Sequence, residues 1–162
     1  DVERKRLHGL AATGRSGSDL GGGLYGAEAT RATYERVCEL ARAVVASGRV
    51  AILDGTFLLR WQRDLARSLA AGLRVPFAIL AFEARPETLR RRILARSLAG
   101  SDASEADLAV LAHQLTTREP LGSDEMRDVV ACDADAPLAQ AFDPETWRDV
   151  RERLWPSSAG PA

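Results

Sequence analysis

The sequence predicts an α/β fold in which helices cover a mainly parallel sheet. Three short apolar runs, at residues 49–54, 75–82 and 128–133, have the continuous apolar character of strands that are buried on both faces. Segments with helical periodicity separate these runs. Strands that alternate with helices form βαβ units, so we expect parallel strands whose carboxyl ends meet at one edge of the sheet. Ligands of open α/β sheets bind at that edge.

The first half of the chain is expected to contain three helices and one strand around a long loop. In chain order these are a helix, a loop, a helix, a strand and a helix: residues 1–8, 9–27, 28–47, 49–54 and 61–72. Apolar residues recur at helical spacing from Val37 to Val44, and Gly48 follows as a helix stop. Gly72 is expected to close the next helix. We interpret the glycine-rich residues 9–27 as a mobile substrate or lid loop.

The second half repeats the alternation of strand and helix. The run 75–82 is a strand, and Pro86 suits the first position of the helix that follows. Ser104 and Asp107 fit a capping box for a third long helix, which Pro120 ends. After the strand 128–133, Asp143 and Pro144 mark the start of a last helix.

Length and composition indicate one globular domain, at residues 1–155, with a disordered tail at 156–162. The chain has 162 residues, 46% hydrophobic and 28% charged, which is typical of a globular protein. Its net charge of −1 argues against a protein that coats nucleic acid. No apolar run approaches the ~20 residues of a membrane span.

The chain opens on a charged segment without an initiator Met or a signal peptide. Cys38 and Cys132 are far apart and lie in apolar patterns, which favours two buried thiols in a reducing compartment. We therefore expect a cytoplasmic protein in which these residues are part of a longer chain. His8 and His113 stand alone, so no metal site is expected.

An acid at the end of the first predicted strand is the first candidate for chemistry. Asp54 closes the run 49–54, and Thr56 follows two residues later. A carboxylate at the ligand-binding edge of a sheet can orient the water on a Mg²⁺ ion or accept a proton. The alternative is that Asp54 only begins a turn or caps the next helix.

Arginines crowd the segment that follows the second strand. Arg92 and Arg96 are four residues apart, so they share one face of the predicted helix. Two guanidinium groups on one face could clamp phosphate oxygens. The alternative is a solvated basic face in a chain whose basic residues are almost all Arg.

The segment Gly9–Ser16 is similar to a phosphate-binding loop, with Arg15 in place of the usual Lys. That loop needs a strand before it and a helix directly after it. A charged helical segment precedes Gly9 and more glycines follow Ser16, so we reject this reading.

Several segments of the chain resemble, in the same order, a family of P-loop small-molecule kinases. The family comprises AAA-type ATP-binding domains similar to gluconate kinase, zeta-toxin and polynucleotide kinase. It includes ATP-binding domains fused behind an aminoglycoside-phosphotransferase-like domain. The resemblance covers roughly residues 1–135 and is carried by Asp1–Leu7, Leu24–Gly26, Val50–Phe57, Glu83–Glu87 with Arg92 and Arg96, and Gln114–Leu121.

The resemblance implies a P-loop NTPase-like three-layer sandwich that uses ATP and Mg²⁺ to phosphorylate a hydroxyl of a small molecule. It implies that Asp1 is the general base and that Arg4 holds the acceptor or a phosphate. Asp54 would lie near the Mg²⁺, and Arg92 and Arg96 would be lid residues on the transferring phosphoryl group. Thr56 is a candidate residue for binding substrate or phosphate. Arg118 matches a segment for which phosphate binding and a structural role both stay open.

The chain departs from the family pattern because it lacks the first strand, the phosphate loop and the helix after the loop. In the family's strand order, 2-3-1-4-5, the missing strand is the central one. The strands at 50–54 and 77–82 would then have no neighbour between them. We therefore expect this chain, on its own, to bind ATP poorly, to lack kinase activity and to be marginally stable.

Three other readings stay in view beside the kinase. The first is a non-catalytic α/β module that binds a nucleotide or a partner for regulation. The second is a receiver-like phosphoacceptor domain, which is disfavoured because that fold needs a Lys near its last strand and Lys5 is the last Lys. The third is a scaffold fragment without a site.

Overall fold

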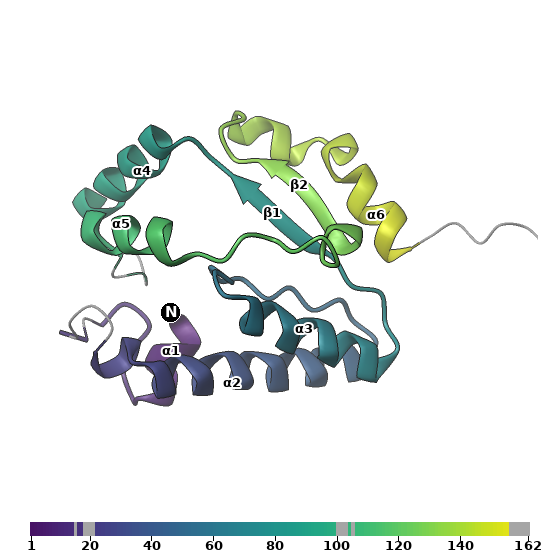
Figure 1. Ribbon diagram of the computed structural model, residues 1–162, viewed down its shortest axis with the longest axis horizontal. Helices are drawn as coiled ribbons and strands as arrows, with labels where there is room; N and C mark the ends of the chain where they lie inside the picture. Colours follow the sequence, from purple (N-terminus) through teal and green to yellow (C-terminus); the bar gives the residue numbers. More distant parts are fainter. Residues whose placement is uncertain (15, 18–21, 100–103, 105, 156–162) are drawn as a thin grey trace, which may run out of the picture.

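The fold is α/β, with a two-stranded parallel sheet and helices around it. The computed structural model describes residues 1–14, 16–17, 22–99, 104 and 106–155. The predicted tail at 156–162 lies outside these residues. Helices α1, α2 and α3 lie together on one side, and strands β1 and β2 lie with α6 on the other (Figure 1).

The helices of the first half are close to those expected. They are α1 (Val2–Leu7), α2 (Ala27–Ala46) and α3 (Arg60–Leu73), with a short 3-10 turn, η1 (Gly23–Tyr25), before α2. Helix α2 ends at Ala46, with Ser47 as its C-cap, and Gly48 adopts the left-handed backbone (φ 78°) expected of a glycine stop. The prediction that Gly72 closes α3 is wrong. The helix runs one residue further, and Arg74 takes the left-handed position (φ 55°).

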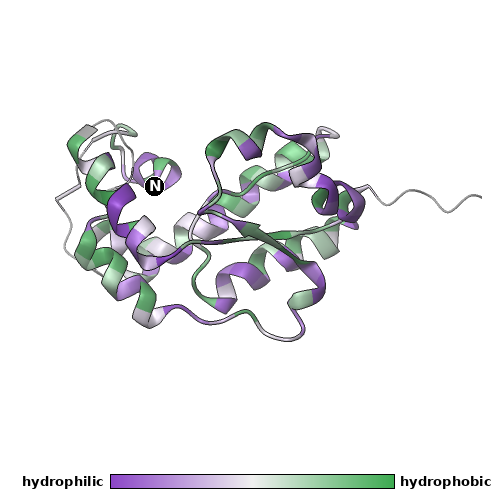
Figure 2. Cartoon of the chain, turned by 90° about the horizontal axis from the view of Figure 1, so that it is seen from above, coloured by the Kyte–Doolittle hydropathy of each residue, from purple (hydrophilic) through white to green (hydrophobic). Residues whose placement is uncertain are grey.

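The sheet consists of β1 (Ile79–Glu83) and β2 (Val129–Asp133), which run parallel. Their register pairs Ile79 with Val129 and continues in step to the acidic pair Glu83 and Asp133 at the carboxyl ends. Both strands were predicted, although the first begins at Ile79 and not at residue 75. Figure 2 shows hydrophobic residues along these strands, as the apolar runs in the sequence require.

The first predicted strand, at 49–54, is wrong: the described residues there form no strand. Two apolar side chains of this run are exposed, Val50 to 53% and Ile52 to 86%, while Ala51 and Leu53 are partly buried. On β1, Phe82 is also 60% exposed. An apolar run becomes a strand only when its backbone N–H and C=O groups find a neighbouring strand, and residues 49–54 have none here.

The second half contains α4 (Pro86–Ala99), α5 (Leu108–Thr117) and α6 (Arg148–Leu154). Pro86 begins α4 as expected. The capping box is wrong, because Asp107 and not Ser104 is the N-cap of α5: its Oδ1 accepts the Val110 N–H at 2.9 Å. Three 3-10 turns complete this half: η2 (Met126–Asp128), η3 (Leu138–Phe142) and η4 (Pro144–Trp147). Asp143 caps η4, which leads directly into α6.

Polar side chains make up as much of the described interior as apolar ones. The buried apolar residues are Tyr34, Ala41, Ala66, Ala70, Ile93, Leu111 and Val130. The buried polar residues are Arg4, Lys5, Thr33, Gln62, Arg63, Thr88 and Glu125. Buried polar groups need partners, so hydrogen bonds and ion pairs between elements hold much of this molecule together. No helix in the described part of the chain is long and apolar enough to cross a membrane.

Candidate functional site

The exposed turn Asp54–Phe57 carries two of the candidate residues. The Thr56 hydroxyl lies 3.4 Å from the Tyr34 hydroxyl of α2, and the Phe57 N–H donates to the same Tyr34 oxygen at 3.3 Å. Phe57 has a left-handed backbone (φ 43°), which is uncommon for a residue other than glycine. Asp54 and Thr56 are therefore presented to solvent on a turn whose conformation is fixed from α2.

A second anchor, Arg63 of α3, holds the same turn from its carbonyl side. Its Nη1 donates to the carbonyl oxygens of Phe57 (3.1 Å) and Leu58 (3.2 Å). The guanidinium is 5% exposed and forms a two-pronged ion pair with the fully buried Glu125, at 2.7 and 3.0 Å. Such forked pairs fix direction as well as distance, so Arg63 holds the end of the turn firmly.

Asp1 and Arg4 lie at the start of the chain against η1 and α2. Arg4 is 9% exposed, and its Nη1 donates to the Leu24 carbonyl (2.7 Å) and the Thr30 hydroxyl (3.1 Å). Its guanidinium lies over the Tyr25 ring at 5.0 Å, and Asp1 Oδ1 lies 3.6 Å from Nε. Burial lowers the pKa of Arg4, an effect that the nearby tyrosines oppose. Arg4 thus holds η1 against α2 while it stays beside the Asp1 carboxylate.

Helix α2 brings these two groups together. Thr30, which binds Arg4, and Tyr34, which binds the Thr56 turn, are four residues apart and so lie on one face of the helix. The segments that carry Asp1 with Arg4 and Asp54 with Thr56 therefore meet successive turns of α2. The sequence gives no direct sign of this, because the contacts join residues 20 to 26 positions apart.

Arg118 lies near the same turn. The residue after it, Glu119, donates its N–H to the Leu58 carbonyl at 2.9 Å, and its carboxylate accepts the N–H of Arg60. Arg63 adds contacts to the carbonyls of Glu119 (3.4 Å) and Pro120 (3.3 Å). The backbone at 118–120 is thus fixed beside residues 57–60. The exposed Arg118 side chain is therefore attached to the chain close to the Asp54–Phe57 turn.

Arg92 and Arg96 lie on α4, and their guanidinium groups contact backbone carbonyls. Arg92 Nη2 donates to Ala134 at 2.6 Å, just beyond β2, and Arg96 Nη2 donates to Ala106 at 3.4 Å, just before α5. Both residues flank the buried Ile93, so they share one region of the helix as predicted.

A network of ion pairs around Arg63 was not predicted from the sequence. Arg60 forms a forked pair with Asp124 (2.9 and 2.6 Å), and Arg67 contacts Asp124 (3.0 Å) and Asp128 (3.2 Å). Arg63 lowers the pKa of Glu125 to about 2, and Arg60 holds the pKa of Asp124 well below its usual range. One signal was available: basic residues at 60, 63 and 67 share a helix face, and acids recur at 124, 125 and 128.

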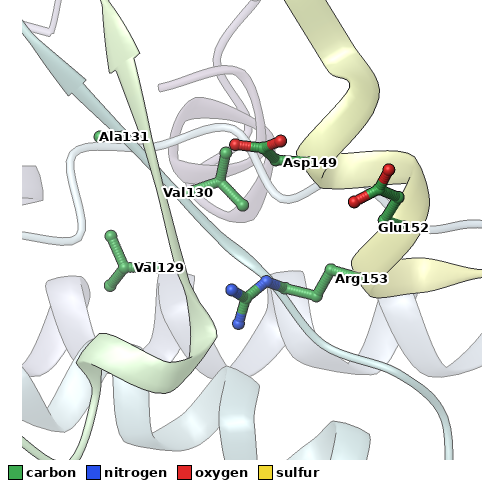
Figure 3. Close-up of a pocket in the computed structure, with 6 residues that line it drawn as sticks. All are labelled: Val129, Val130, Ala131, Asp149, Glu152 and Arg153. Atoms are coloured by element: carbon green, nitrogen blue, oxygen red, sulfur yellow. The ribbon is translucent and has the colours of Figure 1, made fainter. Parts of the chain in front are cut away.

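A separate cavity of about 330 Å³ lies between β2 and α6, away from the candidate residues (Figure 3). Figure 3 shows the residues that line it: Val129, Val130, Ala131, Asp149, Glu152 and Arg153. The described residues include no group of three His, Cys, Asp or Glu side chains that could hold a metal ion. Cys38 and Cys132 are free, half-buried thiols, and burial raises the pKa of each.

The residues present fit part of a site for Mg²⁺ and ATP. The Asp54 carboxylate and the Thr56 hydroxyl are exposed on one turn, which suits a Mg²⁺ ion held through its waters. A cradle of backbone N–H groups for the phosphates is not found among the described residues. Helix α1 precedes Gly9, where a phosphate loop would need a strand.

Comparison with known proteins relates residues 1–121 to a family described as an AAA domain. Uncharacterized proteins of Mycobacterium bovis and Mycobacterium tuberculosis are 34% identical to the chain over 112 residues. The match covers 69% of this chain and 22% of each relative, so the chain spans about a fifth of their length. No solved structure matches significantly. The family match takes in Asp1, Arg4, the Asp54 turn, α4 and Arg118, and the chain belongs to this AAA domain family of P-loop, kinase-like nucleotide-binding domains.

Proposed function

We propose that this chain forms the acceptor side of an ATP-dependent phosphotransferase site. The reaction transfers the γ-phosphoryl group of ATP to a hydroxyl of a small molecule. The observation that carries the proposal is the meeting of two segments on one face of α2. Thr30 binds Arg4 beside Asp1, and Tyr34 binds the turn of Asp54 and Thr56.

In this proposal Asp1 and Arg4 act on the acceptor. The Asp1 carboxylate is about one quarter exposed, so it can accept the proton that the acceptor hydroxyl loses on attack. Arg4 is buried beside Asp1, with its Nε 3.6 Å from Asp1 Oδ1, so its positive charge lies next to the carboxylate that would accept the proton. The acceptor is therefore a molecule whose hydroxyl reaches Asp1 next to Arg4.

ATP and Mg²⁺, when bound, supply the phosphoryl group and neutralise its charge. Asp54 and Thr56 hold the waters of the metal. Arg92, Arg96 and Arg118 supply positive charge toward the phosphates, which requires Arg92 and Arg96 to exchange their backbone contacts for phosphate oxygens.

The proposal assigns the phosphate cradle to sequence outside these 162 residues. The chain covers about a fifth of its mycobacterial relatives, so the whole protein has room for it. The proposal includes a phosphotransferase-like domain fused before this one and a cytoplasmic location. It also holds that the chain alone does not transfer phosphoryl groups.

The test uses the whole protein, incubated with Mg²⁺-ATP and a panel of small molecules that carry hydroxyl groups, with ADP release as the readout. Asp1→Asn and Asp54→Asn are each expected to lower turnover by roughly 100-fold or more, as loss of a positioned acid or base does. Asp149→Asn, on α6 beside the separate cavity, is the matched control and leaves turnover unchanged. Turnover that survives both substitutions overturns the proposal and favours the regulatory, nucleotide-binding module.

A further inference from the structure

Tyr34 contacts the candidate turn at two points with one hydroxyl group. It lies on α2 and is 9% exposed. Its oxygen is 3.4 Å from Thr56 Oγ1 and accepts the Phe57 N–H at 3.3 Å. A tyrosine hydroxyl has one hydrogen and can also accept, so both contacts can exist at once.

The backbone at Phe57 needs this support. A left-handed φ of 43° is unfavourable for a bulky residue and persists only where the surroundings impose it. The Phe57 ring packs edge-on against the Tyr34 ring, with centroids 5.1 Å apart, and Tyr34 packs in the same way on Trp61 at 5.6 Å. The ring contacts hold the turn against α2, and the two hydroxyl contacts restrain the orientation of its backbone.

Gly55 shows how closely the turn approaches Tyr34. A Cβ atom added at Gly55 would lie 3.4 Å from the Phe57 ring and 3.8 Å from the Tyr34 hydroxyl. These are contact distances without a clash, so the turn lies directly against the ring and hydroxyl. Arg63 holds the other side of the turn through the Phe57 and Leu58 carbonyls. The turn that carries Thr56 is therefore held by two buried side chains from two helices, Tyr34 of α2 and Arg63 of α3.

We propose that Tyr34 is a positioning residue, whose hydroxyl sets the direction of the Thr56 hydroxyl and the conformation of the Asp54–Phe57 turn. Its catalytic consequence rests on the proposed function, because Asp54 and Thr56 are the groups it presents. The structural role of Tyr34 in fixing the turn depends only on the contacts described above. Tyr34 is also near Arg4, whose pKa it influences, so one side chain borders both halves of the site.

The first experiment measures amide hydrogen exchange in the full chain. Tyr34→Phe removes only the hydroxyl and keeps the ring, so the fold is expected to persist. Exchange at the Phe57 amide should quicken by roughly 5-fold, the loss of one ordinary hydrogen bond. The Leu111 amide, bonded to Asp107 in α5, should not change. Cys38→Ala, one turn along α2, is the matched control and leaves the Phe57 amide unchanged.

A double-mutant cycle then separates positioning from a general loss of stability. Tyr34→Phe, Thr56→Val and the double variant are compared in the whole protein by ATP turnover. If the hydroxyl acts through Thr56, the double variant is no slower than the slower single variant, and kcat falls while the KM for ATP stays constant. Losses that multiply, or an unchanged Phe57 amide, overturn the proposal.

Failure of the proposed function would give a different pattern. In that case the unsubstituted protein does not turn over ATP, but the Phe57 amide still responds to Tyr34→Phe. The cycle is then read from the free energy of unfolding, where coupling between Tyr34 and Thr56 supports the positioning role and its absence overturns it. Thr56→Val alone is a second test of stability, because it removes the contact between the Tyr34 and Thr56 hydroxyl groups without changing Tyr34.

Discussion

Two apolar runs of this chain have similar sequences and different structures. Residues 50–54 and 79–83 both consist of apolar residues that end in an acid, Asp54 and Glu83. The second run is β1, bonded along its whole length to β2, whereas the first run forms no strand and exposes Ile52 to 86%. The difference shows that an apolar pattern makes a segment able to form a strand, but the strand forms only where a neighbouring strand is present to pair with it.

The unpaired run is nevertheless fixed at its carboxyl end. Tyr34 and Arg63 bind the Phe57 and Leu58 backbone groups, and Glu119 donates its N–H to the Leu58 carbonyl. One run is thus held by a backbone ladder and the other by buried polar side chains. These two kinds of anchor should respond differently to substitution, which the following predictions use.

The largest effect is expected from Arg63→Met, which breaks the polar anchor. It leaves the Glu125 carboxylate buried without its partner, so the free energy of unfolding should fall by about 3–5 kcal/mol. Urea denaturation of the chain measures this. The double variant Arg63→Met with Glu125→Met should recover much of the loss, because no buried charge is left. Arg36→Met, at an exposed pair with Glu39, is the control and should change stability little. A loss below 1 kcal/mol in Arg63→Met would show that the anchor is not buried in solution.

The anchor should also make stability depend on pH. The pKa of Glu125 is about 2 in the folded chain, below the value near 4.3 of an unpaired Glu. A lowered folded pKa adds stability that is complete above the unfolded pKa and is lost as pH falls from about 4.3 toward 2. Asp124 and Asp135 have lowered pKa values as well and act in the same direction. Melting temperature between pH 6 and pH 3 tests this: Glu125→Gln should have a lower melting temperature at pH 6 and a weaker dependence on pH.

Most helices of this fold could be predicted from the sequence, because their signals are local. The apolar periodicity of 28–47, the Gly48 stop and Pro86 all act within a few residues, and each is confirmed. Asp143 is a cap as predicted, but it caps the 3-10 turn η4, and α6 begins only at Arg148. The error at residues 49–54 arose where distant residues decide, whereas the error at the α5 cap is local, because Asp107 binds the Val110 N–H three residues away. Residues 49–54 lack a sheet neighbour, and Asp107 takes the cap that was assigned to Ser104.

The sequence predicts which residues belong to the candidate site but not the contacts that position them. Asp54 and Thr56 follow from the end of an apolar run, but the contacts that fix them come from Tyr34 and Arg63, which carry no motif. The meeting of Arg4 and the Thr56 turn on α2 depends on how that helix packs. Arg92 and Arg96 were predicted on one face of a helix, whereas their backbone contacts at Ala134 and Ala106 depend on tertiary structure.

A third prediction compares the two apolar runs directly. Val130 of β2 is 8% exposed, and Val130→Ala should lower the free energy of unfolding by about 2 kcal/mol through lost burial and the cavity it leaves. Ile52→Ala removes a larger side chain from the exposed run and should change the free energy of unfolding by less than about 0.5 kcal/mol. Denaturation of the two variants in parallel measures both. Equal losses would mean that residues 50–54 are packed in solution.

The smallest effect is expected at Gly122, in the loop that the ion pairs hold against α3. A Cβ atom at Gly122 would lie 2.7 Å from Arg60 Nη1 and 2.8 Å from Asp124 Oδ1, so Gly122→Ala must displace the end of one or both of these side chains. Both partners are about half exposed, so the loss in the free energy of unfolding should be small. Gly72→Ala, inside α3 with open space around it, is the matched control and should stabilise the chain by about 0.5–1 kcal/mol. The same glycine-to-alanine change is thus expected to have opposite signs at the two positions. A stabilised Gly122→Ala variant would show that the Arg60–Asp124 pair does not hold this loop in solution, and it would leave Arg63 and Glu125 as its anchor.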